Sequence, residues 1–379
     1  MEKVITLTIP HIGEKILENI DTDGLLQCLW VSQIWKVLAE NVLVKRWRHK
    51  VFEACEIGKT EIVELLLERL NEKDLDIELN CHENDESGWT AFSVACSNGH
   101  TDIVKLLLTQ SGSKVINWNA TRDTRGGTAF HVACFFGFKD IVQLLVDHSS
   151  CKNIDLNIKD ENGHSAFMRA CQEGHQEVVK LLLDHSERNH IDLNIKDENG
   201  STALLLACDD DEEQDRTDRT EVIGLLLDHA SSKNIDLNAR NSDGWTAFMM
   251  ACYGFQNEQQ ITVFLDKDID LTATSIEGDT CFILACSEGR KEVVKSLLEL
   301  SDSKNIDLNA RTIDGCTAFM EACEHGRYEV VKLLLSHSGS KNIDFNARNN
   351  DGRNAYTLAC TKGHEEVVKL LLDNLERII

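Results

Sequence analysis

Residues 160–183 read DENGHSAFMRACQEGHQEVVKLLL. The opening DENG is typical of a tight turn, because Asp and Asn bond their own backbone and Gly163 tolerates a positive φ. Ser165 predicts the N-terminal cap of a short helix, and Gly174 predicts the end of that helix. The run VVKLLL has the i, i+3 and i+4 apolar spacing of a second helix. This segment therefore predicts a unit of turn, helix, turn and helix.

The dipeptide Ala-Cys marks one position of an internal repeat. Successive copies lie 34 to 44 residues apart, and most often 37. Nine of the 14 cysteines occupy this position, which a small buried side chain explains better than a disulfide or a metal site does. These cysteines are Cys55, Cys96, Cys134, Cys171, Cys208, Cys252, Cys286, Cys323 and Cys360.

The units resemble ankyrin repeats, whose pattern is D-x-x-G-x-T-P-L-H followed by G-H and V-V-x-L-L-L. The resemblance covers residues from about 50 to 375 and implies an all-α solenoid of helix-turn-helix units with short β-hairpin turns. Two departures are regular. The helix-starting proline is always absent, as in Thr90-Ala91-Phe92, and the tail of the typical unit is about four residues longer than usual.

The repeat pattern divides residues 50–379 into a half-repeat and eight repeats. The half-repeat spans about 50–70, and the repeats begin near residues 85, 123, 160, 197, 241, 275, 312 and 349. One repeat carries a seven-residue acidic insertion at 209–215, which we expect to be a surface loop. The repeat that contains Gly244 has a shortened tail and lacks the Gly-His pair.

Residues 1–49 form a separate helical module in our interpretation. Residues 1–50 hold seven Lys or Arg and six Asp or Glu, whereas the whole chain has a formal charge of −25. Stripes of apolar residues predict short helices, and a plain helical cap for the repeats is one interpretation of them. The only proline of the chain, Pro10, lies here.

The same module resembles an F-box. Ile9-Pro10 matches the opening Leu-Pro, Ile16-Leu17 and Ile20-Asp21 match the middle, and Val31-Ser32-Gln-Ile-Trp35 matches the end. The resemblance implies binding to a Skp-family adaptor and a cullin, and hence a substrate-recognition subunit of an SCF-type ubiquitin ligase. It implies adaptor contacts by Ile9, Pro10, Ile12, Ile16, Leu25, Leu26, Val31 and Trp35.

Two other functions remain open at this stage. One is an ankyrin-repeat scaffold with no ubiquitin role, and the other is a pathogen effector that borrows a host ligase. In each case the repeats would bind a protein, and the acidity of the chain favours a basic partner. Positions that vary between repeats are the expected contacts: Trp89, Phe135, Phe136, His164, Trp245, Tyr253 and Arg353. Packing of Phe135 and Phe138 against the neighbouring repeat is an equal alternative.

Composition and motifs argue against several other classes of function. The net charge of −25 argues against nucleic acid as a partner, and no apolar run has the length of a membrane helix. No phosphate-binding loop, nucleophile elbow, HExxH or CxxC motif occurs, so we expect no catalysis, cofactor or metal. We expect reduced cysteines and a cytoplasmic location, with nuclear import through the basic stretch 45–50 as a second possibility.

Overall fold

The computed structural model describes residues 17–28, 33–47, 50–70, 89–110, 116–121, 126–209, 217–255, 258–337 and 339–374. By their mutual contacts these residues form two compact units. The N-terminal unit contains the described residues up to Ala170, together with Asp184–Ile191. The C-terminal unit contains Cys171–Leu183 and the described residues from Asp192 onward. The acidic insertion, apart from Asp209, lies outside the described residues.

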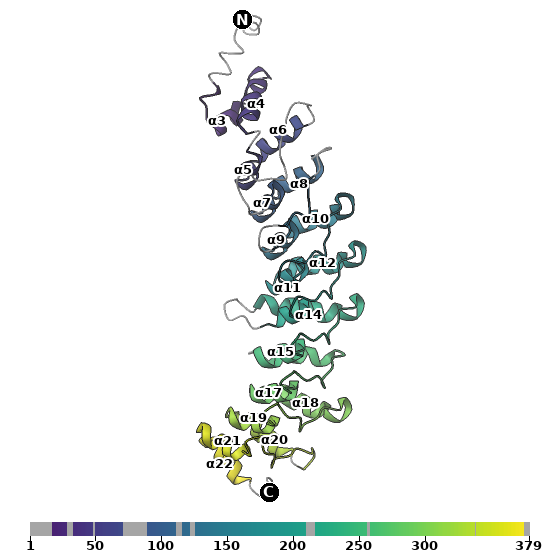
Figure 1. Cartoon of the computed structure of the whole chain (residues 1–379), viewed down its shortest axis with the longest axis vertical. Coiled ribbons are helices and arrows are strands. Elements are labelled where there is room, and N and C mark those ends of the chain that lie inside the picture. The colour runs from purple at the N-terminus through teal and green to yellow at the C-terminus, as the bar shows by residue number, and fades with distance from the viewer. Residues whose placement is uncertain are drawn as a thin grey trace, which may run out of the picture. The chain divides into compact units, whose positions relative to one another are not determined.

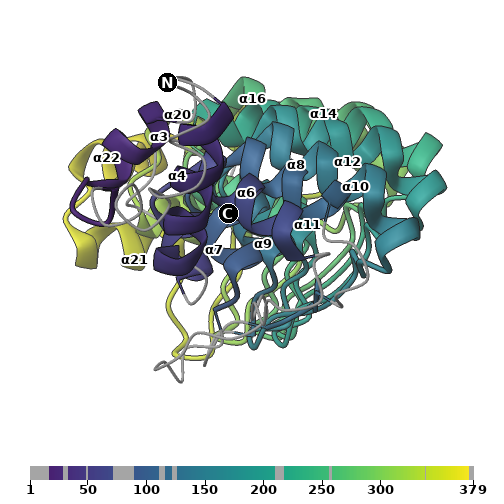
Figure 2. The same cartoon turned by 90° about the horizontal axis from the view of Figure 1, so that it is seen from above.

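The N-terminal unit stacks two layers of helices. The first helices of successive repeats pack as α5 on α7 and α7 on α9, and the second helices pack as α6 on α8 and α8 on α10. The first helices form one layer of this unit and the second helices form the other (Figures 1 and 2). The helices are α3 (Thr22–Cys28), α4 (Gln33–Trp47), α5 (Val51–Glu56), α6 (Thr60–Leu70), α7 (Ala91–Ser97), α8 (Thr101–Gln110), α9 (Ala129–Phe135) and α10 (Lys139–Lys152).

Two helices, α11 (Ala166–Gln172) and α12 (Gln176–Asn189), have residues in both units. The C-terminal unit repeats the same layering, with α15 on α17, α17 on α19 and α19 on α21 in the first layer. Its helices are α13 (Ala203–Cys208), α14 (Thr217–Lys233), α15 (Ala247–Gly254), α16 (Glu258–Thr262), the 3₁₀ helix η2 (Val263–Asp266), α17 (Cys281–Ser287), α18 (Lys291–Lys304), α19 (Ala318–Glu324), α20 (Tyr328–Ser336), α21 (Ala355–Lys362) and α22 (Glu365–Asp373).

The turns are short hairpins, as the sequence predicts. Isolated antiparallel bridges close three of them, between Lys159 and Ser165, Thr274 and Thr280, and Arg311 and Thr317. The described residues contain no longer strand. The all-α solenoid of helix-turn-helix units with hairpin turns is therefore confirmed.

The predicted caps begin the first helices. The hydroxyl of Thr90 accepts the N–H of Ser93 at 3.1 Å, and that of Thr280 accepts the N–H of Ile283 at 3.2 Å. Ser165 does the same for Met168 at 3.3 Å. Each cap satisfies a backbone donor that has no partner inside the helix, so no helix-starting proline is needed to define these ends.

The repeat cysteines lie on the first helices, and nearly all of them face the interior of the stack. Eight of the nine are buried, and Cys360 of the last repeat is exposed. Burial raises the pKa of the Cys55 thiol to about 12, and it raises the pKa of Cys286 as well. Because a thiol buried among apolar groups stays protonated, this position behaves as a small hydrophobic residue.

The repeat with the shortened tail loses its regular second helix. A single turn of α-helix, α16, runs into the 3₁₀ helix η2 in place of a helix like α18. Phe264 of η2 is fully buried, and its ring lies 5.8 Å from that of Phe248. Phe264 therefore supplies a buried aromatic contact in this shortened segment.

The long tails join neighbouring repeats through asparagine side chains. Nδ2 of Asn194 donates to the carbonyl of Asn234 at 2.8 Å, while its Oδ1 accepts the N–H of Asp236 at 2.8 Å. We call such residues the tail asparagines. They are Asn119, Asn157, Asn194, Asn238 and Asn309. The additional tail residues therefore bind the next tail of the stack.

The helices before the repeats pack directly on the first helix pair. α3 packs on α4, and α4 packs on α6. Leu25 and Leu43 are fully buried, and Arg46 donates to the carbonyl of Ile20 at 3.0 Å. The ammonium of Lys59 bonds the carboxylate of Asp23 at 2.6 Å.

Candidate protein-binding surface

The first residue of each turn fixes the residue that follows the turn glycine. Oδ1 of Asn241 accepts the N–H groups of Asp243 at 3.1 Å and Trp245 at 2.8 Å. Asn349 holds Asp351 and Arg353 in the same way. The intervening glycines have φ near +80°. This arrangement holds the backbone of the post-glycine residue at the start of each first helix.

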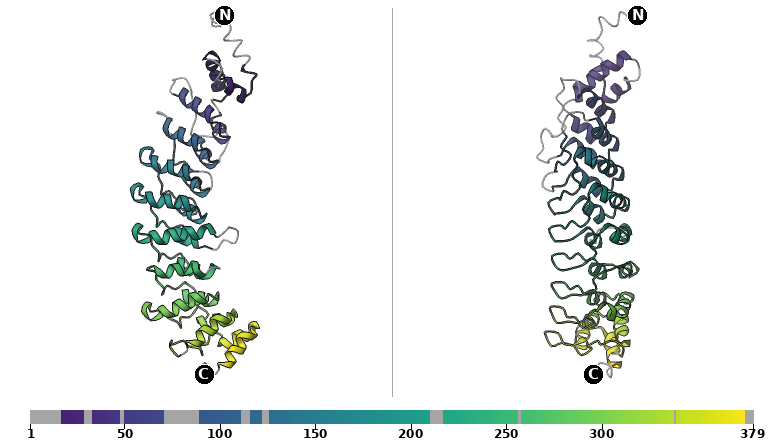
Figure 3. Two further views of the ribbon diagram at one scale, coloured as in Figure 1. Left: turned by 180° about the vertical axis from the view of Figure 1, so that it is seen from behind. Right: turned by 90° about the vertical axis from the view of Figure 1, so that its right-hand side faces the viewer.

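Neighbouring turns are also bonded to each other. In the C-terminal unit the N–H of Ile276 donates to the carbonyl of Asp243 at 2.9 Å, and the N–H of Asn350 donates to that of Asp314 at 2.9 Å. Ile313 and Glu277 form the equivalent bond. The turns therefore form a row that projects from the helices of this unit (Figure 3). Side chains at equivalent turn positions are held side by side along that row.

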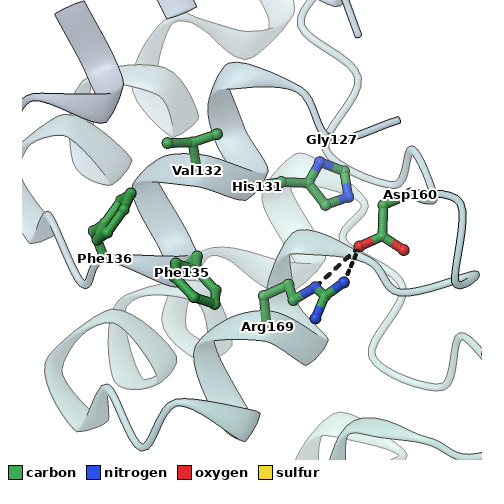
Figure 4. A pocket seen from close by; sticks show the side chains of 7 residues that line it. All are labelled: Gly127, His131, Val132, Phe135, Phe136, Asp160 and Arg169. Atoms are coloured by element: carbon green, nitrogen blue, oxygen red, sulfur yellow. Dashed lines mark hydrogen bonds and ion pairs between the residues drawn. The ribbon is translucent and has the colours of Figure 1, made fainter. Parts of the chain in front are cut away.

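A pocket opens beside the first helices of the N-terminal unit. It has a volume of about 180 Å³. We call it the Phe136 pocket, and its lining is Gly127, His131, Val132, Phe135, Phe136, Asp160 and Arg169 (Figure 4). Phe135 and Phe136 are 40% and 48% exposed, and their rings meet edge to face at 5.1 Å. Large exposed aromatic rings beside a hollow are typical anchors for a protein partner.

An ion pair lies opposite the aromatic side of the Phe136 pocket. Nε of Arg169 donates to Oδ2 of Asp160 at 2.9 Å, and Nη2 donates to the same oxygen. The Asp160 side chain is 5% exposed and that of Arg169 is 20% exposed. Oδ1 of Asp160 accepts the N–H of His164, so the pair also holds the turn. The pocket thus has an apolar wall and a fixed polar wall.

His131 is buried in the Phe136 pocket as a neutral imidazole. Burial lowers the pKa of His131, although its bond to the carbonyl of His164 opposes that shift. Nδ1 accepts the N–H of Thr128 at 3.2 Å, and Nε2 lies 3.2 Å from the carbonyl of His164. Since Nδ1 is an acceptor there, the proton is on Nε2, which donates to that carbonyl.

The predicted partner contacts differ in exposure. Tyr253 and Arg353 are exposed, and Trp89 and Trp245 are half-buried. His164 is only 8% exposed, so its imidazole is available to a partner only if neighbouring groups move. The structure brings Trp245 and Tyr253 together, with ring centroids 5.7 Å apart. Phe136 is partly packed and partly exposed, because its ring stacks on that of Phe138 with centroids 5.7 Å apart.

The predicted adaptor contacts are mostly beyond what the structure describes. Leu25 is fully buried and Leu26 is half-buried, and both belong to α3. Burial of Leu25 in the interior of its own unit does not fit direct contact with an adaptor. The remaining predicted contacts, apart from the backbone of Trp35 in α4, lie outside the described residues: Ile9, Pro10, Ile12, Ile16 and Val31.

One group of potential metal ligands occurs in the C-terminal unit. Ligand atoms of Cys316, Glu321 and Glu324 lie within 4.8 Å of one another. Burial raises the pKa of Cys316 to about 11 and also raises the pKa of Glu321. Lys362 pairs with Glu324 at 3.2 Å. A protonated thiol and a carboxylate already paired with lysine are poor ligands, so we assign this group to packing.

Sequence reasoning missed a row of acidic residues at the third turn position. In the C-terminal unit four successive turns carry an acid there, and all four are exposed: Asp243, Glu277, Asp314 and Asp351. These acids directly precede the turn glycine, whereas the predicted contacts at the turns directly follow it. Alignment of the third turn position would have found this row from the sequence.

Among the described residues, no helix combines the length and the apolar character that crossing a bilayer requires. A family model described as ankyrin repeats in three copies matches residues 51–160, 110–195, 149–235, 216–312, 253–348 and 304–378. These matches together span residues 51–378. The helices α3 and α4 precede them.

No curated protein matches this chain. Among solved structures, the ankyrin repeat domain of Bcl-3, titled a unique member of the IkappaB protein family, matches with a TM-score of 0.51 and 24% identity. That match covers 65% of this chain and 99% of the other. At this identity the likeness concerns the fold alone.

Proposed function

This chain belongs to the ankyrin-repeat family, and from that premise we propose that it is the substrate-recognition subunit of an SCF-type ubiquitin ligase. Ankyrin repeats indicate a protein-protein interaction role. The observation that carries the receptor part of the proposal is the exposure of Phe135 and Phe136 on one side of the Phe136 pocket. When a partner covers such rings, their apolar area is removed from water, which favours binding.

The ligase part rests on the F-box resemblance of residues 1–49. Its characteristic residues are Ile9-Pro10 and Val31-Ser32-Gln-Ile-Trp35. In this proposal the N-terminal module binds a Skp-family adaptor and the repeats bind the substrate. The close packing of α4 on α6 would then link the two binding functions in one unit.

The experiment is co-purification of a Skp-family adaptor with the full chain and with the double variant Ile9→Ala/Pro10→Ala. We expect the variant to lose the adaptor, because hot-spot residues contribute on the order of 2 kcal/mol or more each. Leu372→Ala, which removes an exposed apolar side chain from α22, is the matched control and should retain the adaptor. Retention of the adaptor by the double variant would contradict the F-box assignment.

The second candidate is an ankyrin-repeat scaffold without a ubiquitin role. The observation that favours it is the packing of α4 on α6, because a helical cap would cover the first helix pair in this way. A full chain that never retains the adaptor, yet still binds partners through the Phe136 pocket, would favour the scaffold.

A further inference from the structure

The row of acidic turn residues in the C-terminal unit has two hollows beside it. The turn carboxylates of Asp243, Glu277 and Asp314 have no ion-pair partner among the described residues of the chain. The backbone bonds between successive turns hold these positions in register. Arg240 and Arg311 each donate to the carbonyl of the turn glycine that follows, so they reduce the net negative charge of the row without forming an ion pair with its carboxylates. A cation that enters the row can therefore still pair with these carboxylates.

The first hollow, which we call the Trp245 pocket, combines carboxylates with aromatic rings. It has a volume of about 250 Å³. Asp209 and Asp243 contribute acidic groups, and Trp245, Tyr253 and Met250 contribute apolar walls. The two rings are nearly perpendicular, at 79°. Tyr253 is 53% exposed although its ring contacts that of Trp245.

Two arginines near the Trp245 pocket have other roles. Nη1 of Arg219 donates to the carbonyl of Asp209 at 2.6 Å, and Arg290 donates to the carbonyls of Cys252 and Tyr253. Both arginines are buried. They satisfy carbonyl groups at the ends of first helices.

The second hollow, which we call the Glu277 pocket, follows in the next repeat. It has a volume of about 150 Å³, and its acidic lining is Glu277, Asp279, Asp314 and Glu321. Glu321 lies 3.6 Å from His325, and Asp279 accepts the hydroxyl of Ser275. The carboxylates of Glu277 and Asp314 remain as exposed acceptors at the mouth.

We propose that this row docks a basic segment of the partner protein, with one arginine or lysine in the Trp245 pocket and a second in the Glu277 pocket. The inference rests on the proposed protein-binding function and names the chemistry of the partner. A cation beside Trp245 and Tyr253 gains from the ring faces and from the carboxylates of Asp209 and Asp243. An apolar segment would instead cover those carboxylates and leave them unpaired.

Arginine suits the Trp245 pocket better than lysine. Its planar guanidinium stacks on an aromatic ring and still offers edge donors to carboxylates. A lysine ammonium is more strongly hydrated and gives up more on leaving water. The geometry therefore points to a preference for arginine at the first pocket and to a weaker preference at the second, which has no aromatic wall.

The test uses the full chain and labelled glycine-serine peptides that carry two arginines at increasing separations. Matched peptides carry citrulline, which keeps the shape of arginine but has no charge. We expect binding, measured by fluorescence anisotropy, at one separation and roughly tenfold weaker binding of the citrulline peptide, since exposed ion pairs and cation-π contacts are individually weak. Affinity should fall as salt rises through about 0.1 M.

Variants locate the site. Asp243→Asn/Glu277→Gln should weaken the arginine peptide about fivefold to tenfold, and Tyr253→Leu about threefold, whereas Tyr253→Phe should retain binding. The charge-matched control is Glu221→Gln/Glu299→Gln, which removes two exposed acids from α14 and α18 of the same unit. This control should bind like the unmodified chain, because its altered side chains are on second helices.

Three outcomes would overturn the inference. They are equal binding of the citrulline peptide, equal loss in the control variant, and binding that Tyr253→Leu and Asp243→Asn/Glu277→Gln leave unchanged. The adaptor co-purification tests the proposed function independently of this inference. If Ile9→Ala/Pro10→Ala releases the adaptor while arginine peptides fail to bind, the ligase assignment stands and only the basic-segment inference falls.

Discussion

The guanidinium of Arg169 donates from Nε to Oδ2 of Asp160 at 2.9 Å, while Oδ1 of the same carboxylate accepts backbone N–H groups of its own turn. One side chain thus connects the hairpin turn to helix α11, nine residues further along the chain. Because the polar wall of the Phe136 pocket consists of this pair, the shape of the pocket depends on it.

Replacement of Arg169 by Met should destabilise the chain by about 2 to 3 kcal/mol. The change leaves the 5% exposed Asp160 carboxylate without its cation, and an uncompensated buried charge is costly. Urea unfolding monitored by circular dichroism measures the loss. The double variant Asp160→Asn/Arg169→Met should recover part of it, since asparagine makes the same turn bonds at Asn241 and Asn349. Equal stability of single and double variants would contradict this account.

Stability should depend on pH through His131. Burial lowers the pKa of His131 in the folded chain, whereas the unfolded chain has a pKa near 6.5. Below about pH 6.5 the unfolded state therefore binds the proton more readily, and the free energy of unfolding falls as pH falls, by at most about 1.4 kcal/mol per pH unit. At higher pH the contribution is fully present.

His131→Met is the matched variant for that measurement, because Met249 and Met320 occupy the equivalent position in other repeats. The unfolding free energy of the unmodified chain minus that of the variant should fall as the pH is lowered from about 7.5 through the range in which histidine titrates. A difference that is constant across this range would show that His131 does not titrate on unfolding.

Cys323→Ala should cost about 1 kcal/mol, and Cys360→Ala less than about 0.5 kcal/mol. Cys323 is buried and its pKa is raised by burial, while Cys360 is exposed. Cys323→Asp should unfold its repeat, since it buries an unpaired charge. Thermal unfolding compares the three variants, and mass spectrometry after alkylation of the folded chain should find Cys360 modified long before Cys323.

Phe136→Ala should release the bound partner faster and leave adaptor binding unchanged. The ring is a large anchor beside a pocket, and loss of such an anchor acts mainly on dissociation. Affinity capture without cross-linking, followed by timed washing and quantification of the retained partner, compares Phe136→Ala with Leu372→Ala, which removes an exposed apolar side chain from a second helix. Equal partner release from both variants would place the substrate site elsewhere.

Much of the fold could be predicted because it follows from local signals that recur. The turn DENG, the caps Ser165 and Thr280, and the apolar run of the second helix each act within a few residues. The function of the long tails could not be predicted in this way. The bonds of the tail asparagines join residues thirty or more positions apart, and only a known stacking register brings these residues together.

The candidate site was less predictable for a related reason. Position after the turn glycine predicts exposure for Arg353, but His164 at the same position is buried. The local turn bonds are alike at both, so the difference lies in what the neighbouring repeats place around each side chain. Sequence position alone fixes the backbone there and leaves the environment of the side chain undetermined.

The tail asparagines have a consequence for how such a chain changes length in evolution. Asn119, Asn194, Asn238 and Asn309 each offer the same amide to the same two backbone groups of the neighbouring tail. Loss or duplication of one whole repeat by recombination would therefore bring together ends that already match. The number of repeats is therefore free to vary. A change of a few residues within a tail would instead move its asparagine away from the backbone groups of the next tail.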